Sequence, residues 1–84
     1  MNHKLKIRPE FFQAIIEGRK NFEIRVDDRG YHAGDTVTLN EHKPDAPETC
    51  AYTGRTATYR IGYVSGHAQR NGFVVFSLLP LGEA

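Results

Sequence analysis

The residues best suited to chemistry lie close together, in the stretch from Gly18 to Arg25. Within it, Glu23 and Arg25 alternate with apolar residues, a period that predicts a strand with one solvated face. Both charged residues share that face, and the long side chain of Lys20 can reach it from the preceding turn. A carboxylate between two cations can bind an anion, read the polar edge of a base or move a proton. The alternative is an exposed ion pair that contributes less than about 1 kcal/mol to stability.

Alternation of apolar and polar residues predicts five strands. They cover residues 4–8, 22–26, 36–39, 55–64 and 73–79. In the second strand the pattern places Ile24 on the face opposite to the charged residues, and in the fourth it places Tyr63 on the same face as Ile61. The fifth strand is apolar enough to be central in a sheet or covered on both faces. His3 has the same parity as the apolar residues of the first strand, so its side chain is expected to point inward.

A helix is predicted from about Pro9 to Glu17, after the first strand. Phe11 and Phe12 belong to its broad apolar face, and we expect both to pack in the core between helix and sheet. Gly18 follows as a C-terminal cap. Five short strands need closure or cover at their edges. We therefore expect an α+β, mainly β fold: a small, partly closed barrel with one flanking helix.

Length and charge restrict the possible functions. The chain has 84 residues, which favours one domain spanning residues 1–84 and, we expect, a monomer. Its 11 basic and 10 acidic residues argue against a protein that binds nucleic acid by bulk charge alone, although seven of the basic residues lie within the first 29 positions. The one cysteine, Cys50, fits a reducing compartment, and no apolar run could span a bilayer. We expect a soluble, cytoplasmic protein.

Metal and cofactor motifs are not evident in the sequence. The four histidines are scattered, without a second ligand at the spacing typical of zinc sites. The chain also contains neither a glycine-rich phosphate loop nor a nucleophile-elbow motif. The prediction is therefore a protein without a metal or an organic cofactor.

The octet Gly18–Arg25 resembles the G-x-K-x-x-E-x-R signature of the ASCH superfamily. His3, Gly34-Asp35 and the run Tyr52-Thr53-Gly54-Arg55 extend the resemblance to a short branch of that superfamily, common in phages and bacteria and catalogued as a domain of unknown function. The match spans roughly residues 1–79. It implies a PUA-like barrel, an association with RNA, and a cleft between barrel and helix where Lys20, Glu23 and Arg25 meet.

Three functions remain open from the sequence. The first is binding of RNA or of a nucleotide, with Tyr31 available to stack on a base beside the expected ligand-binding residues. Those residues are His3, Lys20, Glu23, Arg25, Arg29, Tyr52, Thr53 and Arg55.

The second function is catalysis on a modified nucleoside or RNA, with Lys20 as base or nucleophile and Glu23 moving a proton. One small bacterial branch that the chain resembles is an amidohydrolase of N4-acylated cytidines, but it has a threonine where this chain has Glu23. It also uses a further acid late in the chain, and we expect none of the acids after the third strand to lie in a strand. A ribonuclease is a related possibility. The third function is that of a phage accessory protein that binds a host protein through the predicted loop 41–53.

Overall fold

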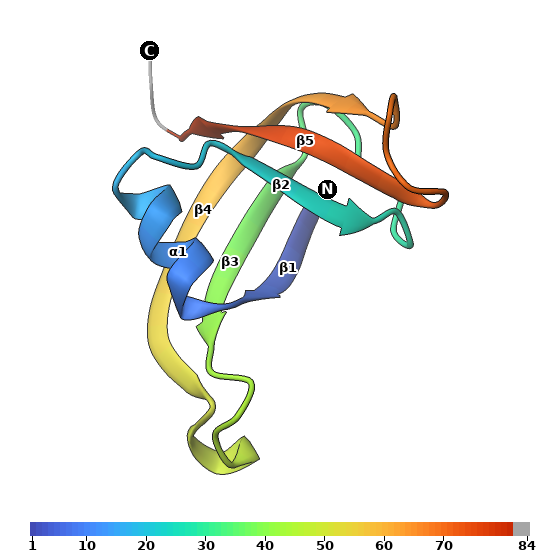
Figure 1. The fold of residues 1–84 in the computed structure, drawn as a ribbon. Coiled ribbons are helices and arrows are strands. Elements are labelled where there is room, and N and C mark those ends of the chain that lie inside the picture. The colour runs from blue at the N-terminus through green and yellow to red at the C-terminus, as the bar shows by residue number, and fades with distance from the viewer. Residues whose placement is uncertain (82–84) are drawn as a thin grey trace.

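A curled five-stranded sheet with one α-helix beside it makes up the computed structural model, which describes residues 1–81 (Figure 1). The elements in chain order are β1 (Asn2–Ile7), α1 (Pro9–Ile16), β2 (Phe22–Val26), β3 (Thr36–His42), the short 3-10 helix η1 (Glu48–Cys50), β4 (Tyr52–Ser65) and β5 (Phe73–Pro80). The strand order is β1-β3-β4-β5-β2, in which β1 and β3 are parallel and all other neighbours are antiparallel. The predicted class, mainly β with a helix after the first strand, is confirmed.

The helix follows β1 because Pro9 stops the strand and suits the first helical position. Phe12 and Ile15 are buried against the sheet, whereas Phe11 and Ile16 are each 46% exposed. The apolar face of α1 is therefore narrower than predicted, and the prediction that Phe11 packs in the core is wrong. Gly18 has a φ of 78°, the left-handed conformation that ends many helices.

The core is formed mainly by side chains of the curled sheet, and α1 adds Phe12 and Ile15 to it. Val37 and Leu39 on β3 are completely buried, and Phe12, Ile61 and Phe76 are each 1% exposed. Within residues 1–81, no helix has the length and apolar character needed to cross a membrane.

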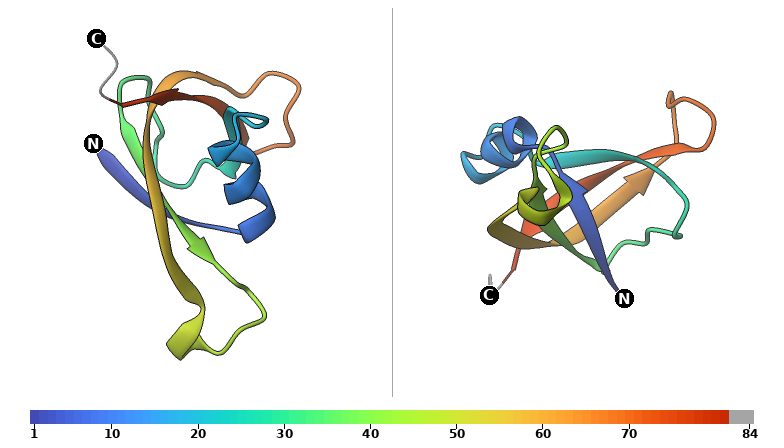
Figure 2. Two further views of the ribbon diagram at one scale, coloured as in Figure 1. Left: turned by 90° about the vertical axis from the view of Figure 1, so that its left-hand side faces the viewer. Right: turned by 90° about the horizontal axis from the view of Figure 1, so that it is seen from below.

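The hairpin formed by β3 and β4 is longer than the sequence predicted. β3 continues to His42 and β4 begins at Tyr52, so the predicted loop 41–53 is shortened to residues 43–51, with η1 at its tip. Figure 2 shows this tip extending beyond the rest of the sheet. The cross-strand pairing of His42 with Tyr52, whose rings are 4.8 Å apart, explains the extension.

A β-bulge interrupts the pairing of β4 with β5. The register shifts between Ile61 and Val64, so both of these residues pack toward the core and Tyr63 is 72% exposed. The predicted sharing of one face by Ile61 and Tyr63 is wrong, because an inserted residue breaks the period of two.

The faces of β2 are reversed relative to the prediction. Glu23 is buried at 4% exposure, while Phe22, Ile24 and Val26 are 39%, 49% and 50% exposed. Simple alternation placed the charged residues in solvent, and the observed strand turns its polar face inward.

The two adjacent phenylalanines of α1 provide a matched test of this packing. We expect Phe12→Ala to lower the free energy of unfolding by about 3–5 kcal/mol, because it removes a buried ring and leaves a cavity. Phe11→Ala should cost about 1 kcal/mol or less, since that ring is half exposed. Urea unfolding followed by far-UV circular dichroism measures both, and equal losses would contradict this packing.

Candidate functional site

A groove of about 580 Å³ lies where the two ends of the sheet, β1 and β2, approach each other beside α1. Its lining residues are Lys6, Ile7, Arg8, Phe11, Lys20, Phe22, Glu23, Ile24 and Arg25. Lys20, Glu23 and Arg25, which the octet placed together, therefore line one hollow.

Glu23 is the buried centre of a three-residue charge cluster at the groove. One of its carboxylate oxygens accepts a hydrogen bond from Lys20 Nζ, and the other accepts one from Arg25 Nε at 2.7 Å. Lys20 Nζ also donates to the backbone oxygen of Phe22 at 2.6 Å. A carboxylate removed from water needs such partners, since an unpaired buried charge is strongly destabilising. This pairing is the physical reason why β2 turns its charged residues inward.

Arginine side chains, rather than backbone hydrogen bonds, bridge the gap between β1 and the β2 segment. Arg25 Nη2 donates to the backbone oxygen of Lys6 at 2.8 Å, and Arg29 Nη1 donates to that of Lys4 at 3.1 Å. The predicted site residue Arg29 thus ties the chain after β2 to β1, outside the groove lining. A guanidinium group spans a wider gap than a ladder bond, which leaves the groove open.

Two phenylalanine rings accompany the amine of Lys20. Its Nζ lies 4.8 Å from the centroid of Phe22 and 5.6 Å from that of Phe11, within the range of cation–π contacts. Both rings belong to the lining and both are more than one-third exposed. The groove therefore presents flat apolar surface next to positive charge.

Positive charge is concentrated at this groove. Its lining includes four basic residues and one acidic residue, an excess of three positive charges, although the whole chain has a formal net charge of only +1. The acidic residue is the buried Glu23, and Lys6 and Arg8 are exposed. An anion that approaches the groove meets cations first.

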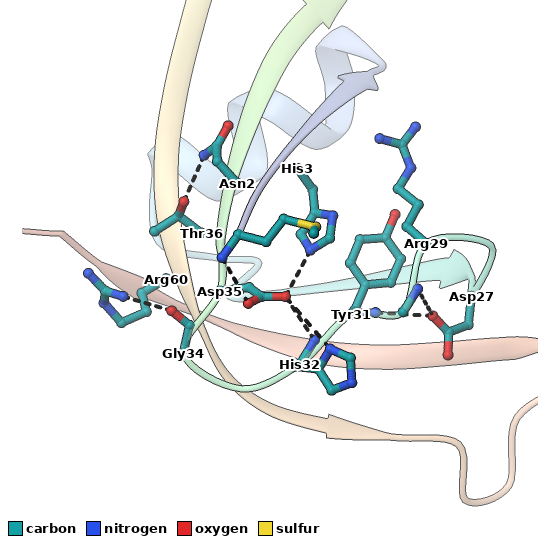
Figure 3. A network of polar contacts seen from close by, with 12 residues as sticks. Asn2, His3, Asp27, Arg29, Tyr31, His32, Gly34, Asp35, Thr36 and Arg60 are labelled. Atoms are coloured by element: carbon teal, nitrogen blue, oxygen red, sulfur yellow. Dashed lines mark hydrogen bonds and ion pairs between the residues drawn. The ribbon is translucent and has the colours of Figure 1, made fainter.

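His3 belongs to a separate polar network, shown in Figure 3. It points inward as predicted, with 3% exposure, and its Nε2 lies 2.9 Å from Asp35 Oδ2. The His3 ring contacts Tyr31, which in turn packs on Phe76 with ring centroids 4.8 Å apart. Tyr31 is 5% exposed, so the expectation that it is free to stack on a base is wrong. His3 is not among the residues that line the groove.

Tyr52, Thr53 and Arg55 belong to a third region, at the loop end of the β3–β4 hairpin. Thr53 Oγ1 donates to Glu41 Oε1 at 2.6 Å, and Arg55 Nη1 lies 3.6 Å from Glu41 Oε2. Arg55 also donates to Gln13 Oε1 at 3.2 Å and so ties the hairpin to α1. These three predicted residues do not line the groove.

Glu41 was not identified from the sequence as a buried residue of a strand. The sequence placed it in a loop, whereas it lies in β3 with 5% exposure. It has the same parity as Val37 and Leu39, so extending the alternation of that strand by one step would have found it.

The fold and the site together define a small, mainly β domain with a cationic groove beside its helix. The family model described as "Domain of unknown function (DUF3850)" matches residues 2–78 of this chain. The chain therefore belongs to that family.

A curated protein of Escherichia phage P2 is also similar to this chain. It is described as an uncharacterized 12.9 kDa protein in the GpA 3′ region, and it is 36% identical over 59 residues. The aligned part covers 70% of this chain and 50% of the phage protein. This chain thus spans about half the length of that relative.

Asp35 predicts a specific pH dependence of stability. The hydrogen bond from His3 is the main cause that lowers the pKa of Asp35 from 3.8 to about 2; partial burial opposes this, and bonds from the Met1 amine and the His32 N–H assist it. The folded state keeps this carboxylate ionised at lower pH than the unfolded state does. Its contribution to the free energy of unfolding is therefore complete above about pH 3.8 and is lost as the pH falls to about 2. The difference in unfolding free energy between wild type and Asp35→Asn should shrink across that interval. A constant difference in urea titrations would contradict this coupling.

Glu23→Gln tests the charge cluster. The substitution keeps the shape but leaves Lys20 and Arg25 side by side without a counter-charge. We expect the free energy of unfolding to fall by about 1–3 kcal/mol. The matched control is Glu10→Gln, which removes an exposed ion pair with Arg8 and should change stability by less than about 1 kcal/mol. Equal effects of the two substitutions would show that the buried carboxylate is not required.

Proposed function

We propose that this chain binds single-stranded RNA or a nucleotide in the groove between β1, α1 and β2. The observation that carries the proposal is the placement of four cations and two phenylalanine rings around one hollow. Phosphate is recognised by lysine and arginine side chains, and an unstacked base is recognised by aromatic stacking. Both requirements are met within the same set of lining residues.

The geometry suggests a division of roles among these residues. Lys6 and Arg8 are exposed at the rim and suit the phosphate. Phe11 and Phe22 suit the base, and Lys20 lies between the rings and the buried carboxylate. Glu23 then acts as the counter-charge that holds Lys20 and Arg25 in position. The near-neutral net charge limits the interaction to a few phosphates.

The resemblance of the octet to the ASCH superfamily supports the same proposal. That superfamily is linked to RNA, and the resemblance implies a cleft at Lys20, Glu23 and Arg25. Of the other residues expected from it, His3, Arg29, Tyr52, Thr53 and Arg55 hold parts of the fold together instead of lining the groove. We therefore centre the binding site on the first three residues and add Lys6, Arg8, Phe11 and Phe22.

We do not extend the proposal to catalysis. Both carboxylate oxygens of Glu23 already accept hydrogen bonds from cations, so a proton transfer would require breaking one of those pairs. The arrangement favours a fixed electrostatic surface over an acid–base group.

The binding proposal is tested with a fluorescein-labelled oligouridylate and fluorescence anisotropy. Lys6→Gln combined with Arg8→Gln should weaken binding. The slope of log K against log salt should become shallower by about 0.7 for each phosphate that the double variant no longer neutralises. Phe11→Ala should weaken binding by about 1–3 kcal/mol, as expected when one base can no longer stack.

Lys43→Gln is the matched control, because Lys43 is an exposed cation on the hairpin loop, outside the groove. Its affinity and salt slope should equal those of the wild type. Because Lys43→Gln removes one charge and the double variant removes two, a loss of binding free energy about half that of the double variant would mean that binding follows net charge instead of the groove. Circular dichroism of each variant verifies that the fold is retained.

A further inference from the structure

A second hollow lies beside the groove and shares Phe22 with it. It has a volume of about 270 Å³ and is lined by residues of β2, β5 and the end of β4. Figure 1 shows the arrangement of these three strands. Its lining includes Asn21, Phe22, Tyr63, Ser65, Ser77 and Leu79. The reversal of β2 is what brings Phe22 to this outer side of the sheet, where it is 39% exposed.

The bulge in β4 places Tyr63 at this hollow. Tyr63 is 72% exposed, and its backbone N–H donates to Ser77 Oγ at 3.0 Å instead of continuing the ladder with β5. The preceding Gly62 leaves no room for a side chain, since a Cβ there would lie 2.8 Å from Ser77 Oγ. Bulges that aim one side chain outward are common beside binding sites. An exposed tyrosine held in this way is suited to a ligand.

The chemistry of this hollow differs from that of the groove. None of its nine lining residues is charged, so it offers nothing to a phosphate. Beside the buried Phe76, it combines the exposed rings of Phe22 and Tyr63 with the amide of Asn21 and the hydroxyl groups of Ser65 and Ser77. A flat, neutral group with polar edges fits such a lining, and a nucleobase is a group of that kind.

We propose that this hollow binds the base next to the one held in the groove, so that the chain recognises two consecutive nucleotides. The inference rests on the proposed function, because the groove has to hold the first nucleotide. Phe22 lines both hollows, so they lie next to each other. The connecting phosphate then lies toward the cationic groove and both bases lie on aromatic surface.

Uridine 5′-monophosphate and the dinucleotide pUpU separate the two hollows, with binding followed by ¹⁵N–¹H NMR titration. The wild type should bind the dinucleotide about tenfold or more tightly than the mononucleotide, as expected for one additional stacked base. Tyr63→Leu should abolish that gain and leave mononucleotide affinity unchanged. Tyr63→Phe keeps the ring and should keep most of the gain.

The outcomes distinguish the two proposals. If the mononucleotide binds at the groove and the dinucleotide binds no more tightly, the proposed role of the second hollow is overturned and the proposed function stands. If Tyr63→Leu weakens the binding of both ligands equally, the proposed role of the second hollow is also overturned. If neither ligand binds, both proposals fail. Light scattering measures self-association. If the wild type is oligomeric and Tyr63→Leu is monomeric, the surface around Tyr63 is a protein interface and its proposed role in binding a base is overturned.

Discussion

The buried carboxylate of Glu23 is the constraint on which the rest of this structure depends. It lies at 4% exposure with a cation on each oxygen, and removing it from water without those partners would cost several kcal/mol. Lys20 and Arg25 supply those partners on the inner side of β2. The strand is thereby fixed with its charged residues inward, and its apolar residues must face solvent.

This orientation has consequences at both ends of the sheet. Arg25 reaches the backbone of β1 and closes the gap there with a side chain, so that β1 and β2 remain far enough apart for a groove. The apolar residues turned outward enlarge the hydrophobic surface beside β5. A small domain seldom exposes such a surface without a use. One electrostatic requirement therefore produces a cationic groove and an aromatic hollow next to it.

Most of the fold could be predicted from the sequence, because Pro9, Gly18 and the alternating strands are local signals. The orientation of β2 could not, since alternation alone does not reveal whether a charged residue finds partners inside. The exposure of Tyr63 was missed because a bulge inserts one residue and reverses the face on which the following residues lie. A bulge has only a weak signal in the sequence. The cluster of Lys20, Glu23 and Arg25 was predicted because its members are neighbours in the chain. The positions of His3 and Arg55 depend on contacts with Asp35, Glu41 and Gln13, which are remote in sequence.

The remaining polar residues show how a chain of this length can support an open groove. The His3–Asp35 pair joins β1 to the turn before β3. The cluster of Glu41, Thr53 and Arg55 fastens the long hairpin to α1. Small domains bury a limited fraction of their surface, so hydrophobic packing alone leaves little reserve for keeping a hollow open. Paired and hydrogen-bonded side chains compensate by fixing the sheet ends and the helix relative to one another. Among the residues that resemble a ligand-binding motif but lie away from the groove, His3, Thr53 and Arg55 make contacts that contribute to this rigidity.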